Sequence, residues 1–521
     1  MERIVIYDTT LRDGSQTEGI SFSVEDKIKI ARRLDEIGVA YIEGGWPGSN
    51  PKDQEFFRHF AENKTRHAVI AAFGSTRRCG IKPIEDANLL ALIKSQAETI
   101  TIFGKTWDLH VTDVLKTTLE ENLMMIHDSV RFLKKKNKEV FYDAEHFFDG
   151  FRHNPEYAMR TLHAAQDAGA DVLILCDTNG GFLPEDIRKT VLSLKNGIHI
   201  PLGIHCHNDL DMAVANSIAA VEAGCIQVQG TFVGLGERCG NADLGTIIGI
   251  LYSKLQRKSI PDKNISKLMD AAYFIGEVSN IKLSDSAPFI GHSAFAHKGG
   301  VHIDAVIKNP AAYEHIAPEV FGNHRRFVTS ELAGKMPIVL KAEKLNFKLD
   351  KKSPQAKALL KQMQEKERQG YQFEAADASF ELMLKRTLTR YKPFFKLEGF
   401  KVSTEKRFDG KVFAEATVRL AVNGEERFNA STGDGPVDAL DRALRTALLP
   451  FYPQLQEMHL RDYKVRVLDP QEGTAAKVRV LIESQDLHDS WTTVGVHENI
   501  IEASWEALTD SIEYKLLKAK K

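Results

Sequence analysis

The sequence predicts an α/β protein whose first part is a (β/α)8 TIM barrel, and two observations lead to this fold class. Short runs of aliphatic and β-branched residues recur through the first half of the chain, as buried parallel strands require. Helical stretches separate most of these runs, and the series takes about 275 residues, close to the size of a typical barrel. The runs read RIVIYD, VAYIEGG, HAVIAAF, ETITIF, EVFYDAE, DVLILCDT, PLGIHCH and CIQVQGTFVG.

The connections between these strands carry the signals of helix ends. The first helix is expected within residues 23–38, with Ser23 as its N-cap and Gly38 at its C-terminal end. A helix end, a glycine and a new strand recur as DEIGVAYIE, DAGADVLIL and EAGCIQVQG. An open, doubly wound sheet is the structural alternative, but the first strand is not followed by Gly-x-Gly-x-x-Gly. The barrel is therefore the favoured interpretation, over residues 1–280.

Two further regions follow the predicted barrel. Residues 281–390 lose the strand pattern and contain histidine- and glycine-rich loops and a charged helical stretch. They are expected to form a mostly helical linker region that completes the active site. In residues 391–521, a pattern of strand, turn, strand, glycine and helix occurs twice. This duplication predicts a C-terminal α+β domain of two ββα-type repeats, which would serve regulation or dimerisation.

Composition argues against several classes of partner. The 69 basic and 71 acidic residues almost cancel, so the charge indicates neither a nucleic-acid-binding nor a membrane-surface protein. No apolar run in the sequence approaches the roughly 18 residues that span a bilayer. The five cysteines are scattered and odd in number, which fits reduced thiols better than a disulfide framework. A cytoplasmic protein that acts on small molecules is the expectation.

Polar residues follow the predicted strands at their C-terminal ends, where barrel enzymes carry their chemistry. His205 and His207 are two residues apart at the end of one strand, so both side chains face the same way. With Asp13 after the first strand and Asn241 after the eighth, they would bind one divalent metal ion. The alternative is that the two histidines only cap the strand. This ligand set suits zinc, manganese, cobalt or magnesium.

Several of these segments also carry a family resemblance. DTTLRDGSQ, HCHND and GLGERCGNADL resemble the signatures of the α-isopropylmalate synthase, homocitrate synthase and citramalate synthase family. FAHKGGVHIDAV and the duplicated C-terminal region extend this resemblance over nearly the whole chain. Within the family, FGSTRR, TIFGKTWDLHV and YDAEHFFDG resemble the long bacterial (R)-citramalate synthases. The resemblance implies a metal-dependent barrel enzyme that condenses acetyl-CoA with pyruvate, then hydrolyses the thioester, in a route to isoleucine.

The resemblance also implies roles for residues at the barrel mouth. Arg12 would stabilise the ketone oxygen of pyruvate, and Glu43 would orient Arg12 or a metal-bound water. An Arg12–Glu43 salt bridge is the structural alternative. Thr178 would bind the carboxylate of pyruvate, with a helix cap as its alternative role, and Glu145 would lie near the acetyl group.

Four more residues have implied roles in substrate binding and proton transfer. Tyr142 and His110 would line the pocket for the methyl group, although Tyr-x-x-Glu departs from the Tyr-x-Glu spacing of pyruvate-specific relatives. His302 and Tyr313 would assist in removing a proton from the acetyl group, and each taken alone would be structural. Because both follow the barrel, they are expected to reach the active site of the partner chain in a homodimer.

Other functions and a regulatory site complete the sequence-based hypotheses. The sister activities of 2-isopropylmalate and homocitrate synthase are the alternative substrate assignments. Related acyl-CoA lyases carry a GGCPYA-type loop where this chain has GLGERCGNADL, which argues against a lyase. A non-catalytic amino-acid sensor should lack part of the metal-ligand set, which argues against that function as well.

Gly433 and Gly495, each before a predicted helix, would present backbone N–H groups to isoleucine as a feedback inhibitor.

Overall fold

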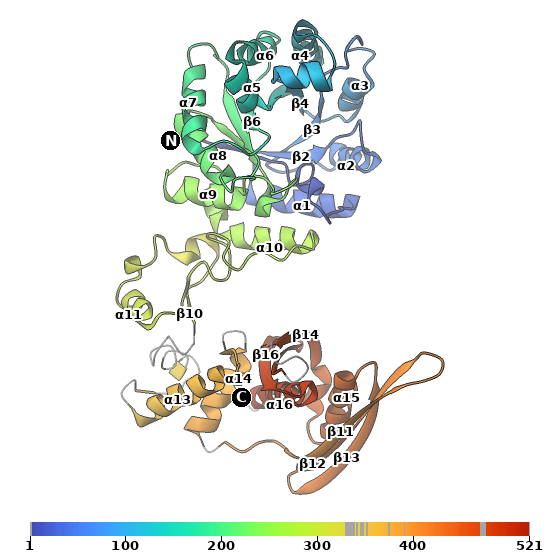
Figure 1. Ribbon diagram of the computed structural model, residues 1–521, viewed down its shortest axis with the longest axis vertical. Coiled ribbons are helices and arrows are strands. Elements are labelled where there is room, and N and C mark those ends of the chain that lie inside the picture. Colours follow the sequence, from blue (N-terminus) through green and yellow to red (C-terminus); the bar gives the residue numbers. More distant parts are fainter. Residues whose placement is uncertain are drawn as a thin grey trace. The chain divides into compact units, whose positions relative to one another are not determined.

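Eight parallel strands close into a barrel, as the sequence predicts (Figure 1). The computed structural model describes residues 3–328, 339, 342–343, 349–350, 353–373, 376–389, 391–468 and 476–519. β1 (Val5–Asp8) pairs with β2 (Tyr41–Gly45) and also with β8 (Gln227–Gly230), so the open-sheet alternative is wrong. The remaining strands are β3 (Val69–Ser75), β4 (Thr99–Lys105), β5 (Glu139–Glu145), β6 (Val172–Asp177) and β7 (Leu202–Cys206).

Helices surround the barrel (Figure 1). The first, α1 (Val24–Ile37), begins after a capping box formed by Ser23 and Asp26 and ends at Gly38, whose φ is 89°. Among the described helices of the whole chain, none has the length and apolar character needed to cross a membrane. The other helices here are α2 (Pro51–Glu62), α3 (Ala87–Lys94), α4 (Leu119–Lys134), α5 (Phe147–His153), α6 (Pro155–Asp167), α7 (Pro184–Leu194), α8 (Ala213–Ala223), α9 (Leu244–Ser253) and α10 (Leu268–Val278), with the short turns η1 (Gly14–Gln16), η2 (His110–Val114), η3 (Phe232–Gly234), η4 (Asp262–Lys267) and η6 (Pro318–Phe321).

The alternation of side chains along the strands creates two separate cores. Tyr7, Phe141 and Ile174 belong to a small cluster inside the barrel. Their neighbours in sequence, such as Ile6, point outward and pack with the helices in a much larger cluster. The interior also holds polar groups, because the Tyr7 hydroxyl donates a 2.8 Å hydrogen bond to Glu43 Oε1. The barrel is therefore a filled core with polar side chains among the apolar ones, and not a pore.

The chain divides into two compact units, residues 1–295 with 316–325 and residues 296–315 with 326–521. The second unit begins with β9 (Ala296–His297), α11 (Gly300–Lys308), η5 (Pro310–Ala312) and β10 (Arg326–Phe327). Two longer helices follow, α13 (Pro354–Arg368) and α14 (Asp377–Leu388). The part of residues 281–390 that the structure describes is mostly helical, as expected. The rest of that range lies outside the described residues.

Two sheets with one helix each form the C-terminal repeats. The first contains β11 (Lys396–Lys406), β12 (Val412–Val422) and β13 (Glu425–Gly433), followed by α15 (Pro436–Leu448). After η9 (Pro453–Glu457), the second contains β14 (His459–Val467), β15 (Val478–Gln485), β16 (Ser490–His497) and α16 (Ile500–Ala519). Residues of both repeats share one core. The duplication is confirmed.

Each repeat is βββα, with one strand more than the ββα layout expected from the sequence. The additional strands are β11 and β14, which form an edge of their sheets. Within these two fully described strands no residue is buried, because charged side chains alternate with half-exposed ones. Their apolar residues, among them Leu397, Phe400 and Tyr463, are only half-buried against the shared core, so their hydrophobic signal is weaker than that of a buried strand.

Candidate metal centre

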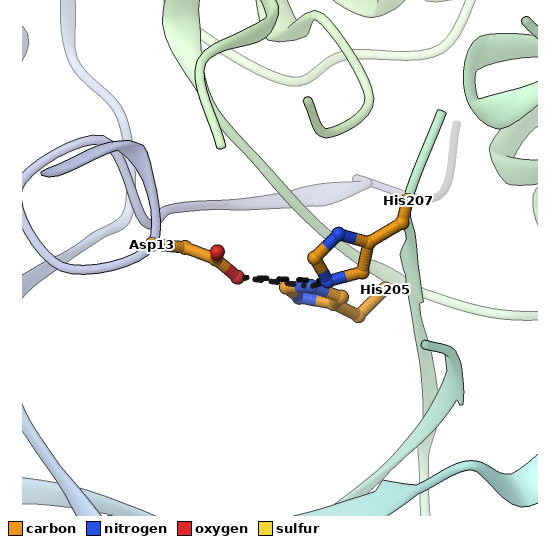
Figure 2. Close-up of side chains that lie close together, drawn as sticks. All are labelled: Asp13, His205 and His207. Carbon is orange, nitrogen blue, oxygen red and sulfur yellow. Dashed lines mark hydrogen bonds and ion pairs between the residues drawn. The ribbon is translucent and has the colours of Figure 1, made fainter. Parts of the chain in front are cut away.

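Asp13, His205 and His207 lie together at the C-terminal end of the barrel (Figure 2). His205 is on β7 and His207 follows directly, so both rings point the same way while Cys206 packs into the outer core. Asp13 stands in the turn between β1 and η1. Its Oδ2 is 3.3 Å from His205 Nε2 and 3.9 Å from His207 Nε2, and these nitrogens are 3.4 Å apart. The three side chains can offer their ligand atoms to one ion.

Asn241 joins this group through the loop after β8. Its backbone pairs with that of His207 in an isolated antiparallel bridge, which places it beside the histidine. Its Nδ2 donates a 3.1 Å hydrogen bond to the Leu235 carbonyl, so Oδ1 is left as an acceptor. Gly236 allows this close packing, because its φ is +152° and a Cβ there would lie 2.1 Å from Asn241 Nδ2.

The polar atoms of this group fit a cation. Asp13 Oδ1 and Asn241 Oδ1 are buried and accept no hydrogen bond from any residue that the structure describes. A buried acceptor without a partner costs roughly 1–3 kcal/mol, which a bound cation would offset. Two imidazole nitrogens, a carboxylate and an amide oxygen also match the mixed ligands of divalent transition metals. The residues present therefore fit one divalent metal ion.

Burial and nearby charges set the protonation states of these ligands. Burial alone would raise the pKa of Asp13, but the Arg12 guanidinium and the hydrogen bond with His205 hold it well below its usual range. Burial and the neighbouring His205 lower the pKa of His207 to about 4, so this ring is neutral at pH 7. Burial would also lower the pKa of His205, but Asp13 outweighs it and raises that pKa. A cation would compete with the proton for this position.

Arg12 is held between a carboxylate and an aromatic ring. Its Nε donates a 2.6 Å hydrogen bond to Glu43 Oε2, and its Cζ lies 3.8 Å from the centre of the Phe73 ring. Its NH1 atom is 3.3 Å from Asp13 Oδ2. The structure thus contains the Arg12–Glu43 salt bridge, and the same guanidinium also borders the metal group. Arg12 can therefore form the salt bridge with Glu43 and border the metal group at the same time.

Two interior residues that were not singled out in the sequence complete the surroundings of His205. Gln229 Oε1 is 3.0 Å from His205 Nδ1, and Gln229 Nε2 donates a 3.1 Å hydrogen bond to Asp143 Oδ1. Burial raises the pKa of Asp143 to about 7. The sequence held a signal for Gln229, because Gln227 and Gln229 in CIQVQG repeat with the period of side chains on one face of a strand.

An aromatic wall stands next to Arg12, at the ends of β2, β3 and β4. The rings of Phe73 and Phe103 stack at 5.5 Å, and Trp46 packs edge-on against both, at 5.8 and 5.7 Å. Lys105 lies 5.5 Å above the Phe103 ring and forms an ion pair with Glu145. This wall therefore extends from Arg12 to Glu145.

Thr178 and His110 are connected through His146. The Thr178 Oγ1 accepts a 2.9 Å hydrogen bond from the His146 backbone N–H. The ring of His146 lies 4.2 Å from that of His110, which also stacks on Trp107 at 5.3 Å. Burial and the neighbouring His146 lower the pKa of His110. Arg238 donates a 2.8 Å hydrogen bond to the Thr178 carbonyl and so links this group to the loop after β8.

Tyr142 does not have the position that a substrate pocket requires. Its side chain is fully buried in the outer core, between the barrel and the helices, whereas Phe141 lies in the interior. Asp143 is the neighbour that faces the interior, through its bond to Gln229. Positions three apart on a strand face opposite sides, so Tyr142 and Glu145 cannot both face the substrate. The geometry therefore does not support Tyr142 as a pocket residue.

His302 and Tyr313 lie side by side in the second unit. His302 is on α11 and Tyr313 follows η5, and their rings stack with centres 4.3 Å apart. The Tyr313 side chain is 48% exposed. The structure thus brings together the two residues that the resemblance implies for proton transfer.

Gly433 and Gly495 contact helices by their backbones. A Cβ at Gly433 would lie 2.4 Å from the Ala439 nitrogen on α15, and one at Gly495 would lie 2.0 Å from the Ala503 oxygen on α16. The first amides of α16 are occupied by Asn499, whose Oδ1 accepts from Ile501 at 2.8 Å. These contacts give the two glycines a packing role and do not support carboxylate binding at them.

Three family models match consecutive parts of the chain. Residues 3–275 match the HMGL-like family, residues 289–369 the homocitrate synthase post-HMGL domain-like family, and residues 374–516 the LeuA allosteric (dimerisation) domain. The first match alone covers more than half of the chain. The barrel, the region after it and the C-terminal repeats therefore each have known relatives.

Curated proteins match the chain from end to end. The (R)-citramalate synthase of Geobacter sulfurreducens is 53% identical, over 100% of this chain and 99% of that protein. The (R)-citramalate synthase of Aquifex aeolicus is also 53% identical, over 99% of this chain and 98% of that protein. The 2-isopropylmalate synthase of Methanocaldococcus jannaschii is 31% identical, over 100% of this chain and 96% of that protein. The similarity is thus clearly greater to the first two proteins.

Proposed function

Because the chain belongs to the (R)-citramalate synthase family, within the HMGL-like family, we propose that it condenses acetyl-CoA with pyruvate. The acetyl group is transferred through its methyl carbon and so becomes an alkyl group, and hydrolysis of the thioester then gives (R)-citramalate and CoA. The observation that carries this proposal is the buried Asp13, His205, His207 and Asn241 group with its two unpaired oxygens. The group borders the Arg12 guanidinium, as a reaction that builds negative charge on a ketone oxygen requires.

The condensation joins the methyl carbon of acetyl-CoA to the ketone carbon of pyruvate, whose oxygen receives the electron pair. A divalent ion (zinc, manganese, cobalt or magnesium) held by the four ligands would supply Lewis-acid chemistry to this ketone. Arg12, fixed by Glu43, stabilises the negative charge on the same oxygen. The Thr178 oxygen already accepts from the His146 N–H, so its hydroxyl hydrogen is free to donate to the carboxylate of pyruvate.

A base must remove a proton from the acetyl methyl group before the new bond forms. We assign this step to His302, with Tyr313 stacked on its ring. Both residues come from the second subunit of a homodimer, and the LeuA dimerisation domain supports such an assembly. Glu145 stands on the acetyl side of the site, where Lys105 holds its carboxylate.

The aromatic wall supports a small 2-oxo acid as the substrate. Phe73 adjoins the guanidinium of Arg12, so the Phe73 and Phe103 rings border the place where the ketone would bind. Two stacked rings leave less room than aliphatic side chains would and present an apolar surface. A methyl group satisfies both conditions better than a branched chain or a second carboxylate.

The C-terminal repeats have a proposed regulatory role. Isoleucine would bind this LeuA-type domain and inhibit by stabilising one of two states of the enzyme, without competing for the metal. Isothermal titration should show isoleucine binding, and turnover should fall at millimolar isoleucine. Absence of both effects would contradict the proposal and leave leucine as the next ligand to test. Substitution of Gly433 or Gly495 is not a suitable test, because a side chain there would clash with α15 or α16.

The activity is tested by the release of CoA thiol from acetyl-CoA with a panel of 2-oxo acids. Pyruvate should give the highest kcat/KM, above 2-oxobutanoate, 2-oxoisovalerate and 2-oxoglutarate, and chiral chromatography should identify (R)-citramalate. A preference for 2-oxoisovalerate would assign the chain to 2-isopropylmalate synthesis, and one for 2-oxoglutarate to homocitrate synthesis. No thiol release with any acid would contradict the synthase function itself.

A further inference from the structure

Gln229 connects His205 to a carboxylate deep inside the barrel. His205 is on β7, Gln229 on β8 and Asp143 on β5, and all three side chains are buried, with exposed fractions of 4%, 0% and 4%. The amide of Gln229 lies between the two partners, 3.0 Å from His205 Nδ1 and 3.1 Å from Asp143 Oδ1. Asp143 and Gln229 are far apart in the sequence, so the closed barrel is what brings them together.

The hydrogen-bonding role of each group in this network determines the role of its neighbour. The charged Asp143 carboxylate only accepts, so in that state the Gln229 NH2 group faces it and the Gln229 oxygen faces His205. An oxygen there accepts only from a ring nitrogen that carries hydrogen, so His205 is protonated at Nδ1. When this ring is neutral, its Nε2 carries the lone pair that a metal ion would accept, and the Asp13 and His207 atoms lie 3.3 and 3.4 Å from it.

We propose that Gln229 and Asp143 are positioning residues that hold His205 in the tautomer and orientation in which it binds the metal. This inference rests on the metal site of the proposed function. Neither residue touches substrate, because both act through the histidine. Partners of this kind typically contribute 10–100-fold to metal affinity.

His207 provides an internal contrast. Its Nδ1 is buried and has no hydrogen-bond partner within the described part of the chain. Only its backbone is fixed, by the bridge between His207 and Asn241. Removal of the Gln229 amide should therefore weaken metal binding through His205 specifically.

The test measures metal binding without substrate. The probe is Co²⁺ alone, titrated into the full-length, metal-free protein against a competing chelator, with visible absorption reporting the ligand geometry. Gln229→Leu should raise the Kd for Co²⁺ about 10–100-fold, because it removes the acceptor for His205 Nδ1. Gln227→Leu is the matched control, since Gln227 lies two residues earlier on the same face of β8. Its Kd should match that of the wild type.

A reciprocal exchange separates positioning from packing. Gln229→Glu alone places two carboxylates side by side and should bind Co²⁺ poorly. Combined with Asp143→Asn, the asparagine NH2 can donate to the new glutamate, which can still accept from His205. The double variant should recover affinity and the wild-type absorption spectrum. If Gln229→Leu does not fold, Gln229→Asn takes its place, because it stays polar but is too short to span both partners.

Three outcomes would overturn the inference, and they can be told apart. If the wild type binds Co²⁺, His205→Ala abolishes that binding and Gln229→Leu leaves the Kd unchanged, the positioning role is wrong and the metal site stands. The positioning role is also wrong if the double variant binds no better than Gln229→Glu. If His205→Ala binds Co²⁺ as well as the wild type, the metal site of the proposed function fails and the positioning role fails with it.

Discussion

The barrel mouth and the C-terminal repeats both bury charged side chains, but they satisfy them differently. In the repeats, the Lys515 ammonium lies 2.7 Å from Asp486 Oδ2 and 3.2 Å from Glu457 Oε2, so the cation has its anions within the fold. At the mouth, Asp13 and Asn241 each keep a buried oxygen without a hydrogen bond from the described residues. The Lys515 ion pairs are complete within the fold, whereas the mouth leaves acceptors for a cation from outside.

This difference distinguishes a binding site from a structural ion pair without reference to any relative. A protein that leaves buried acceptors unpaired loses stability unless a ligand supplies the missing partner. The loss of stability is therefore tolerated at sites where a bound ligand offsets it. Mutations at the mouth should mainly reduce function, and mutations in the ion pairs of the repeats should mainly reduce stability.

The largest effect is expected when a metal ligand is removed. His205→Ala should lose bound metal and at least about 10³-fold in kcat/KM, because the Lewis acid is lost with its ligand. The thermal unfolding temperature of the metal-free protein should change little. Metal analysis, the thiol-release assay and calorimetry measure these three quantities.

His199→Ala is the matched control for this variant. His199 is an exposed histidine shortly before the same strand, and its replacement should leave metal content and turnover unchanged. A His205→Ala protein that keeps its metal and its turnover would disprove the ligand assignment.

The second prediction tests whether the site is shared between subunits. His205→Ala and His302→Ala should each be inactive alone, and mixing them should restore activity if His302 serves the partner's barrel. With free exchange, half of the dimers are mixed and each contains one intact site, so about a quarter of the wild-type activity is expected. Native mass spectrometry measures the exchange. No recovery in a mixture that has exchanged would place His302 in the site of its own chain.

The barrel and the metal ligands could be predicted from the sequence because the signals are local. Runs of apolar residues give the strands, and the spacing of two between His205 and His207 gives their common direction. The same rule, applied to Tyr142 and Glu145, would have placed them on opposite sides of β5. The pocket interpretation of Tyr142 followed the family pattern instead, and the structure does not support it.

Other parts of the site depend on contacts that no local pattern contains. Asp143 and Gln229 are 86 residues apart, and only the closure of the barrel brings their side chains together. The aromatic wall likewise combines the ends of three strands. In the repeats, β11 and β14 bury no residue, so their hydrophobic signal was too weak to identify them. Local hydrophobicity identifies buried strands and misses edges.

The third prediction concerns the stability of the repeats. Asp486→Asn should reduce the free energy of unfolding by about 2 kcal/mol, which corresponds to lowering its pKa from 3.8 to about 2. Burial opposes this shift, and the Lys515 ammonium, together with the backbone N–H groups of His488 and Asp489, outweighs it. Asp489→Asn is the matched control, because the Asp489–Lys518 pair is exposed and should contribute less than about 1 kcal/mol.

The sign of the pH dependence follows from the lowered pKa. The wild type should be more stable than Asp486→Asn above the unfolded pKa of about 4, where the carboxylate is charged in both states. The advantage should shrink as the pH falls towards about 2, where Asp486 takes up its proton in the folded protein. Calorimetry of both proteins between these limits measures the difference, and a constant difference would contradict the ion-pair account.

The smallest expected effect concerns substrate choice at the aromatic wall. Phe103→Ala should raise the kcat/KM for 2-oxobutanoate relative to that for pyruvate about tenfold, because the removed ring leaves space beside Phe73 for another carbon. Metal affinity should stay unchanged, since the Phe103 ring touches none of the four metal ligands in the described contacts.

Tyr142→Phe is the control, because the Tyr142 side chain faces the helices and its hydroxyl has no hydrogen-bond partner within the described residues. It should leave the ratio unchanged. A larger change in this ratio in Tyr142→Phe than in Phe103→Ala would contradict this prediction. It would indicate that Tyr142, and not the aromatic wall, determines the choice of substrate.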